Sequence, residues 1–317
     1  MNPDDAFNPE ISRRRFLRHA AWAGAAVAVT VSGGVVTSKV LHHGGAAPKA
    51  EDFTFVQISD SHIGFTGAAN PDVTKTFQSA IDLVNGLPAQ PDFVVHTGDL
   101  THFSTREQFD QVKQMLSTLR TGQVVVLPGE HDSTDDAGQK YRQFFGAGTQ
   151  GDGWFSFDHR GAHFVALVNT INLQKLGHLG ADQLAWLEAD LKRVSGETPL
   201  VVFSHIPLFA MYPDWGWGTD DATTALGHMR RFGSVTVLNG HVHQLMKKVE
   251  GNITFHTAAP TAYPLPHPGD GPAPKPVVVA AGQLHRALGI RQARLVPGRH
   301  GLAVADQELT SPPVRPG

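Results

Sequence analysis

Apolar and polar positions follow two alternating periods between residues 53 and 306. Short apolar runs rich in β-branched and aromatic residues predict strands at 53–58, 93–95, 124–127, 200–203 and 235–238. Segments with apolar side chains three or four positions apart predict helices at 73–84, 106–119 and 181–194. Strands that alternate with helices indicate βαβ units and a layered α/β fold.

Three pairs of apolar runs depart from this alternation and predict β-hairpins. They lie at 154–158 with 163–168, at 245–249 with 253–256, and at 288–295 with 302–304. Hairpin strands pair antiparallel, whereas strands joined by a crossover helix pair parallel. The sequence therefore predicts mixed sheets, followed after the second hairpin by a loop at 260–276 that is rich in proline and glycine.

Residues 1–50 have the pattern of an export signal followed by a linker. A basic segment at 12–18, which contains Arg13 and Arg14, precedes an apolar stretch rich in alanine, glycine and valine at 20–36. The paired arginines resemble a bacterial twin-arginine signal. The apolar stretch of about 17 residues is shorter than the ~20 that a transmembrane helix needs, which favours export over a permanent anchor.

This interpretation predicts where the protein acts and how the chain divides. We expect the twin-arginine translocase to carry it to the periplasm or the extracellular space. No clear Ala-x-Ala cleavage site precedes Ala50, so a chain that keeps the signal as a membrane tether remains an alternative. The predicted parts are the signal and linker at 1–50, one folded domain at 51–306 and a C-terminal tail at 307–317.

Composition narrows the classes of function. The chain has 317 residues, of which 41% are hydrophobic, so it can bury a large core without disulfides. It has no cysteine, which excludes thiol chemistry and cysteine-ligated zinc. A net charge of −3 argues against a nucleic-acid partner, because proteins that bind phosphate backbones usually carry a basic face.

Potential metal ligands directly follow five of the predicted strands. These residues are Asp60, His62, Asp99, Glu130, His131, Asp132, His205, His241 and His243. In open α/β sheets, ligands bind beyond the carboxyl ends of the strands, so we expect these side chains to meet at one edge. Carboxylate oxygen and imidazole nitrogen together favour zinc, iron, manganese or cobalt. Glycines at 98, 129 and 240 precede several of these ligands, where the backbone turns sharply and approaches closely.

The order of these motifs resembles that of the calcineurin-like metallophosphoesterases, which have Asp-x-His, Gly-Asp, Gly-Asn-His-Asp, a single His and Gly-His-x-His. The resemblance covers residues 53–256 and implies a four-layer α-β-β-α sandwich with mixed sheets. It also implies a binuclear metal centre at the rim of the sandwich. One metal would be held by Asp60, His62 and His243, the other by His205 and His241, with Asp99 between them. His131 would contact the phosphoryl oxygen or protonate the leaving group.

One position departs from this pattern, because Glu130 stands where the family has asparagine. A glutamate still offers an oxygen, so we expect Glu130 to bind the second metal rather than to lie displaced behind it. Its negative charge would also repel an approaching phosphate group.

The predicted activity is hydrolysis of a small-molecule phosphate ester, either a diester or a monoester. Two metal ions (manganese, iron, zinc or cobalt) would activate a bridging hydroxide that attacks phosphorus in line. Either Asp132 or a backbone carbonyl would fix His131 as the acid. The alternative is a weakly active or non-catalytic metal-binding periplasmic protein, in which Glu130 marks lost activity. A metallo-β-lactamase fold is excluded, because the chain lacks that fold's His-x-His-x-Asp-His cluster.

Four further residues are candidates for substrate binding. The loop after His205 carries Tyr212, Trp215 and Trp217, whose rings can stack on an aromatic part of the substrate or form a local hydrophobic plug. His102 follows the Gly-Asp motif and either reaches the cleft or lies in a solvated loop.

Overall fold

The computed structural model describes residues 26–32, 35–41, 52–171, 173, 175–296 and 301–309. The chain divides into two compact units, Met1–Lys49 and Ala50–Gly317, and each is described by itself. In the first unit, β1 (Ala26–Ser32) pairs antiparallel with β2 (Val35–Leu41). The paired arginines of the predicted signal lie outside the described residues. None of the helices in the described part has the length and apolar character needed to cross a membrane.

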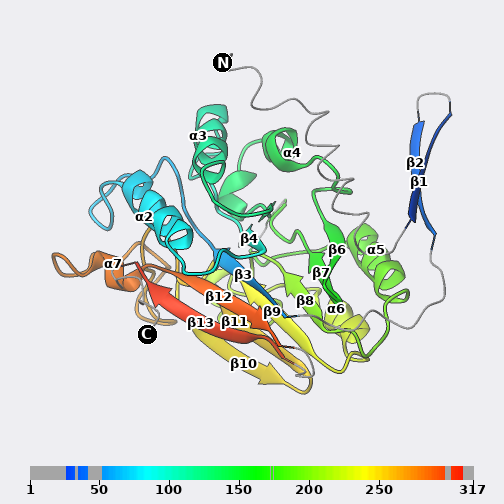
Figure 1. Cartoon of the computed structure of the whole chain (residues 1–317). Coiled ribbons are helices and arrows are strands. Elements are labelled where there is room, and N and C mark those ends of the chain that lie inside the picture. The colour runs from blue at the N-terminus through cyan, green and yellow to red at the C-terminus, as the bar shows by residue number, and fades with distance from the viewer. Residues whose placement is uncertain are drawn as a thin grey trace, which may run out of the picture. The chain divides into compact units, whose positions relative to one another are not determined.

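The second unit contains two mixed sheets (Figure 1). The five-stranded sheet has the order β13-β12-β3-β4-β5. Its strands are β3 (Phe53–Ile58), β4 (Phe93–His96), β5 (Val124–Val126), β12 (Gly289–Leu295) and β13 (Ala303–Glu308). Strands β3, β4 and β5 are parallel, and β12 is antiparallel to both of its neighbours. The carboxyl ends of β3, β4 and β5 therefore lie at one edge of this sheet.

The six-stranded sheet has the order β10-β11-β9-β8-β7-β6. Its strands are β6 (Phe155–His159), β7 (Ala162–Ala166), β8 (Leu200–Phe203), β9 (Val235–Asn239), β10 (Met246–Glu250) and β11 (Ile253–Thr257). The four central strands are parallel, and the edge strands β6 and β10 are antiparallel to their neighbours. The predicted hairpins are confirmed, with boundaries shifted by at most four residues.

Helices cover the outer face of each sheet (Figure 1). The helices and 3-10 turns are α2 (Val73–Asn85), α3 (Arg106–Leu116), η2 (Glu130–Asp132), α4 (Gln139–Phe145), α5 (Ala181–Leu191), η3 (Pro213–Trp215), α6 (Ala222–Met229) and α7 (Leu284–Ala287). One core cluster joins α2, α3 and α4 to the five-stranded sheet, and another joins α5 and α6 to the six-stranded sheet. A third cluster lies between the sheets. These four layers confirm the predicted fold class.

The alternation of side chains along β3 shows how one strand serves two layers. Val56 and Ile58 face the helices, whereas Phe53 and Phe55 face the other sheet, because successive strand residues point to opposite sides. Phe55 stacks on Phe93 of β4 with ring centroids 4.7 Å apart and meets Phe164 of β7 edge-on at 5.9 Å. Aromatic pairs of this kind contribute about 0.5–1.5 kcal/mol each beyond burial. The contact between Phe55 and Phe164 joins the two sheets, whereas that between Phe55 and Phe93 lies within one sheet.

Candidate metal centre

The loops that follow β3, β4 and β5 of one sheet, and β8 and β9 of the other, bring the predicted ligands together. Their side chains form two groups whose ligand atoms lie within 4.8 Å of one another. The first group contains Asp60, His62, Asp99 and His243. The second group contains Glu130, His205 and His241. All seven metal ligands predicted from the sequence thus lie where the two sheets meet.

The first group is almost completely buried. His62 Nε2 lies 3.2 Å from His243 Nε2 and 3.4 Å from Asp99 Oδ2, and His243 Nε2 lies 3.3 Å from Asp60 Oδ1. The side chains of His62 and Asp99 are each 2% exposed. Two nitrogens and two oxygens therefore converge on a small volume that is closed to bulk solvent.

The second group is built around Glu130. Its Oε2 lies 2.8 Å from His205 Nε2, and its Oε1 lies 2.8 Å from His241 Nδ1. Asp99 Oδ2 lies 3.5 Å from His205 Nε2 as well as 3.4 Å from His62 Nε2 of the first group. A single carboxylate oxygen thus stands between the two groups, as a bridging ligand requires.

Backbone carbonyls orient two of the histidines. His205 Nδ1 donates to the carbonyl of Thr97 at 2.7 Å, and His243 Nδ1 donates to the carbonyl of Tyr263 at 2.5 Å. In the neutral imidazole that metal binding requires, each bond leaves the Nε2 lone pair directed at the cluster. Burial lowers the pKa of His205, but without metal the carboxylates of Asp99 and Glu130 outweigh it and hold the pKa well above its usual value. This arrangement of ring nitrogens is typical of metal-ligating histidines.

Several buried polar atoms at the cluster have no hydrogen-bond partner. They are Asp60 Oδ2, Glu130 Oε2, His205 Nε2 and both ring nitrogens of His241. Buried polar atoms are normally paired, because leaving one unpaired costs about 1–3 kcal/mol. Metal coordination would satisfy the lone pairs that they carry. A donor set of carboxylate oxygen and imidazole nitrogen, with no sulfur, therefore fits two ions of the zinc, iron, manganese or cobalt type.

The carboxylates of the cluster are held in their charged form. Burial alone raises the pKa of Asp60, but the facing His243 and His205 outweigh it and lower the pKa to about 2. Burial likewise raises the pKa of Glu130, and His241 and His205 hold it well below its usual value. Both side chains are anionic near neutral pH and are ready to act as ligands.

The backbone at the ligand positions is strained. The φ angles of Asp60, His62, Asp99, His241 and His243 all lie between 42° and 68°, in the left-handed region that non-glycine residues rarely adopt. Each such residue costs about 1–3 kcal/mol, and strain of this kind clusters at functional sites. Backbone hydrogen bonds hold these turns, including Asp60 N to Gly98 O at 3.0 Å and His62 N to Asp99 O at 2.9 Å.

Two glycines allow the loops to approach closely, as the sequence predicted. A Cβ at Gly129 would lie 2.0 Å from Asp99 Oδ1. Gly98 has a φ of 104°, and a Cβ there would lie 2.4 Å from His205 Nδ1. Any side chain at these two positions would therefore displace a ligand of the cluster.

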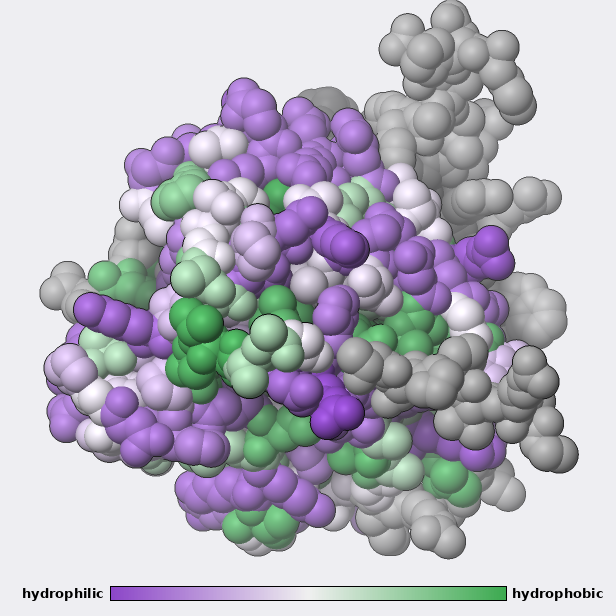
Figure 2. Space-filling view, turned by 90° about the vertical axis from the view of Figure 1, so that its left-hand side faces the viewer, coloured by the Kyte–Doolittle hydropathy of each residue, from purple (hydrophilic) through white to green (hydrophobic). Residues whose placement is uncertain are grey.

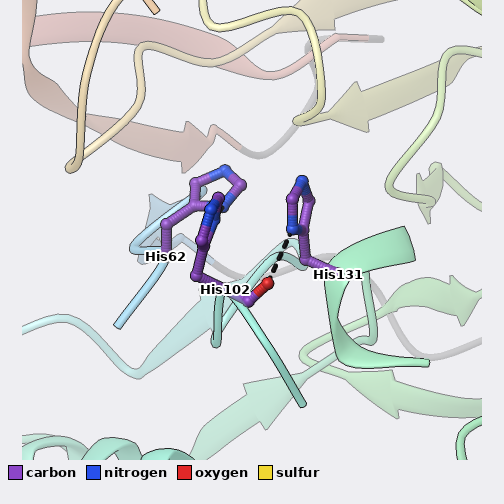
Figure 3. Close-up of side chains that lie close together, drawn as sticks. All are labelled: His62, His102 and His131. Atoms are coloured by element: carbon purple, nitrogen blue, oxygen red, sulfur yellow. Dashed lines mark hydrogen bonds between the residues drawn. The ribbon is translucent and has the colours of Figure 1, made fainter. Parts of the chain in front are cut away.

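His131 lies beside the first group, next to His62 and His102 (Figure 3). Its Nδ1 donates to the carbonyl of His102 at 2.9 Å, and its backbone N–H donates to Asp99 Oδ1 at 2.9 Å. Burial lowers the pKa of His131, but the carboxylates of Asp99 and Glu130 outweigh it and raise the pKa overall. Of the two partners predicted for this histidine, the structure shows the backbone carbonyl.

Asp132 supports the loops instead of contacting the ring of His131. Its carboxylate accepts bonds from the backbone N–H groups of Leu100, Thr101 and Gly129, and from the Thr101 hydroxyl, at 2.8–3.0 Å. Burial and the nearby Asp99 raise the pKa of Asp132 to about 7. Its side chain therefore joins the turn after β4 to the turn after β5, which corrects the expectation of a catalytic contact.

His102 reaches the site, as one of its two interpretations predicted. Its ring stacks on His131 with centroids 4.6 Å apart, and its Nδ1 lies 3.3 Å from His62 Nδ1.

Phe103 meets the ring of His102 edge-on at 4.5 Å and is 58% exposed. Leu245, two residues after His243, is 52% exposed. Figure 2 shows that hydrophobic side chains gather among hydrophilic ones on the face at the left of Figure 1.

The aromatic loop after β8 forms a local plug. Trp217 is 1% exposed, which corrects the prediction that its ring binds substrate. Trp215 packs edge-on against both Trp217 and Tyr212, with centroids 5.1 Å apart in each case. Tyr212 and Trp215 are only partly buried, so the second interpretation, a hydrophobic plug, is shown for Trp217 alone.

Tyr263 and Phe65 belong to the site but were missed by sequence analysis. The ring of Tyr263 stacks on His62 at 4.9 Å, and Phe65 lies 4.4 Å from Tyr263. Tyr263 lies in the loop at 260–276, whose proline and glycine content indicates a turn but not its direction. Phe65 follows the Asp-x-His motif by three residues, and this nearness to a ligand was the one available signal.

Comparisons with known proteins agree with this geometry. The model of the calcineurin-like phosphoesterase family matches residues 53–245. A probable glycerophosphodiester phosphodiesterase of Arcobacter nitrofigilis is 25% identical over 220 residues, which cover 64% of this chain and 77% of that protein.

Two solved structures share the fold. A dimetal phosphatase from Danio rerio superposes with a TM-score of 0.57 at 16% identity, over 80% of this chain and 98% of that one. A purple acid phosphatase from yellow lupin superposes with a TM-score of 0.59 at 13% identity, over 84% of this chain. The match spans about half (53%) of the lupin chain.

Proposed function

Because the chain belongs to the calcineurin-like phosphoesterase family, we propose that it is a two-metal-dependent hydrolase of small-molecule phosphate esters. One observation carries the proposal. Asp99 Oδ2 lies 3.4 Å from a histidine nitrogen of the first ligand group and 3.5 Å from one of the second. Two complete ligand groups that share one carboxylate are the arrangement that a two-metal hydrolase needs.

Each ligand group would hold one ion. Asp60, His62 and His243 would bind the first, and Glu130, His205 and His241 the second, with Asp99 shared. When bound, such ions supply Lewis acidity and activate water for an in-line displacement at phosphorus. The oxygen and nitrogen donors support manganese, iron, zinc or cobalt as the metal.

The remaining polar groups serve the ester. His131 is fixed at Nδ1 by the His102 carbonyl, so its Nε2 is free to donate a proton or a hydrogen bond to an ester oxygen. The stacked ring of His102 limits the rotation of His131. Phe103 and Leu245 offer apolar surface to the organic part of the substrate.

The test is metal-dependent turnover. The purified chain is stripped of metal, reloaded separately with Mn²⁺, Fe²⁺, Zn²⁺ or Co²⁺, and assayed with bis(p-nitrophenyl) phosphate and p-nitrophenyl phosphate. Asp99→Asn removes the shared carboxylate, whereas Asp182→Asn changes an exposed aspartate of α5 and serves as the matched control. We expect turnover in the parent and in Asp182→Asn, with a loss of at least about 100-fold in Asp99→Asn. Equal turnover in all three proteins would refute the role of Asp99 as the shared ligand. No turnover with any metal would favour the non-catalytic alternative.

The site of action is a second part of the proposal. The basic segment at 12–18 and the short apolar stretch after it support export by the twin-arginine translocase, with membrane tethering if the signal is retained. Replacement of Arg13 and Arg14 by lysine should keep the protein in the cytoplasm. Cell fractionation of the two forms tests this, and unchanged export would contradict it.

A further inference from the structure

Glu130 differs from the other carboxylates of the metal centre in its exposure. Its side chain is 26% exposed, compared with 0% for Asp60 and 2% for Asp99. It begins η2 (Glu130–Asp132), four residues after the end of β5. Of the three carboxylate side chains, that of Glu130 is therefore the one that solvent reaches most.

Both oxygens of Glu130 face histidine nitrogens of the second ligand group. Oε1 lies 2.8 Å from His241 Nδ1, and Oε2 lies 2.8 Å from His205 Nε2. Glu130 Oε2, His205 Nε2 and His241 Nδ1 have no hydrogen-bond partner, so these groups converge where an ion of the second group would bind. The negative charge of Glu130 would therefore lie beside that ion.

The charge of Glu130 changes the balance of the whole centre. Two divalent ions would carry four positive charges, against three negative charges on Asp60, Asp99 and Glu130 and one on the attacking hydroxide, so the loaded centre would be neutral. A neutral amide in place of Glu130 would leave one positive charge. A phosphodiester carries one negative charge, whereas a monoester carries about two above its second pKa of about 6. Glu130 therefore removes one unit of positive charge from the centre, and a dianion loses about twice as much Coulomb attraction as a monoanion.

We propose that Glu130 is a specificity-determining residue, which makes the centre selective for phosphodiester monoanions over phosphomonoester dianions. The inference rests on the proposed function and names its substrate class. Coulomb repulsion acts on each unit of substrate charge, so Glu130 penalises the dianion more than the monoanion. At the short distances within a metal centre, this difference amounts to about tenfold in relative affinity, even with partial screening by solvent.

The kinetic test compares three proteins at pH 8, where the monoester is a dianion. Glu130→Gln removes the charge and keeps an oxygen, and Glu130→Asp keeps the charge in a shorter side chain as the matched control. The measured quantity is the ratio of kcat/KM for bis(p-nitrophenyl) phosphate to that for p-nitrophenyl phosphate. We expect this ratio to fall about tenfold in Glu130→Gln and to stay within about threefold of the parent value in Glu130→Asp. An unchanged or higher ratio in Glu130→Gln would overturn the inference.

A binding measurement gives a readout that does not depend on turnover. Calorimetry of the metal-loaded proteins compares inorganic phosphate, largely a dianion at pH 8, with the monoanion dimethyl phosphate. Glu130→Gln should bind phosphate about tenfold more tightly relative to dimethyl phosphate than the parent does. Equal effects on the two anions would overturn the inference, whatever the metal content determined in parallel by mass spectrometry.

Different results would refute the proposed function and the role of Glu130. If the parent turns over neither ester with any metal, the proposed function fails. If the parent turns over an ester but the selectivity ignores the charge at position 130, the function stands and the role of Glu130 is refuted.

Discussion

His163 lies outside the two ligand groups and tests how a buried charge stabilises the fold. The side chain belongs to β7 and is 5% exposed. Its Nδ1 lies 2.7 Å from Asp158 Oδ1 of β6, and its Nε2 lies 2.8 Å from Asp190 Oδ2 of α5. Burial lowers the pKa of His163, but the two carboxylates outweigh it and raise the pKa to about 9. The charged imidazole thus joins two strands and a helix.

The size of the effect follows from linkage. The unfolded chain titrates near 6.5, and the folded pKa is about 9. One pKa unit corresponds to about 1.36 kcal/mol, so the protonated His163 stabilises the fold by about 3 kcal/mol. Because the folded pKa is raised, this stability is fully present below pH 6.5. It is lost as the pH rises from 6.5 through about 9.

The assay is equilibrium unfolding in urea at pH 6 and at pH 10, followed by circular dichroism with a chelator present to remove metal binding. Three proteins are compared: the parent, His163→Gln, and His228→Gln of α6 as the matched control. The parent and the control should lose about 3 kcal/mol more of their free energy of unfolding between these pH values than His163→Gln does.

When the changes in free energy of unfolding are compared between the three proteins, the contributions of titrating groups that all three share cancel. If His163→Gln showed the same pH dependence as the parent, the charged bridge between β6, β7 and α5 would be refuted.

Three further predictions concern the metal centre. His131→Ala should lower kcat by about 10²–10⁴-fold, because the backbone carbonyl of His102 holds His131 with its Nε2 free to donate a proton. Two metal ions should remain bound, because His131 belongs to neither proposed ligand group, and a loss of kcat below tenfold would contradict this prediction. Gly129→Ala should release metal, since its Cβ would lie 2.0 Å from Asp99 Oδ1, whereas Gly227→Ala of α6, with open space around it, should retain both ions by mass spectrometry. When the free metal concentration is 1,000 times the Kd, removal of the metal should lower the free energy of unfolding by about 4 kcal/mol per bound ion. A melting temperature that does not change when chelator is added would contradict this.

Much of the fold was predictable because its central strands are short and mostly apolar. Helices α2, α3 and α5 were also predicted. Each begins at the predicted residue, and its last residue lies within three residues of the predicted end. Helix ends depend on capping and packing rather than on periodicity alone. Helices α4 and α6 were missed, because they are short and Gly227 interrupts the apolar pattern of α6.

The ligands of the candidate site were predictable because they share one position, directly after parallel strands. The groups that orient them were not, since the carbonyls of Thr97 and Tyr263 belong to the backbone and leave no signal in residue type. For Asp132 and Trp217, residue type alone was misleading. Their residue types suit chemistry, but the turns of the chain direct one into a backbone network and the other into a plug.

The central claim is that two metal ions bind where the two sheets meet, and a crystal structure of the Mn²⁺-loaded protein tests it most directly. An anomalous difference map should show two peaks about 3.5–4 Å apart on either side of Asp99. One peak should lie among Asp60, His62 and His243, and the other among Glu130, His205 and His241. A single peak, or peaks away from Asp99, would contradict the account.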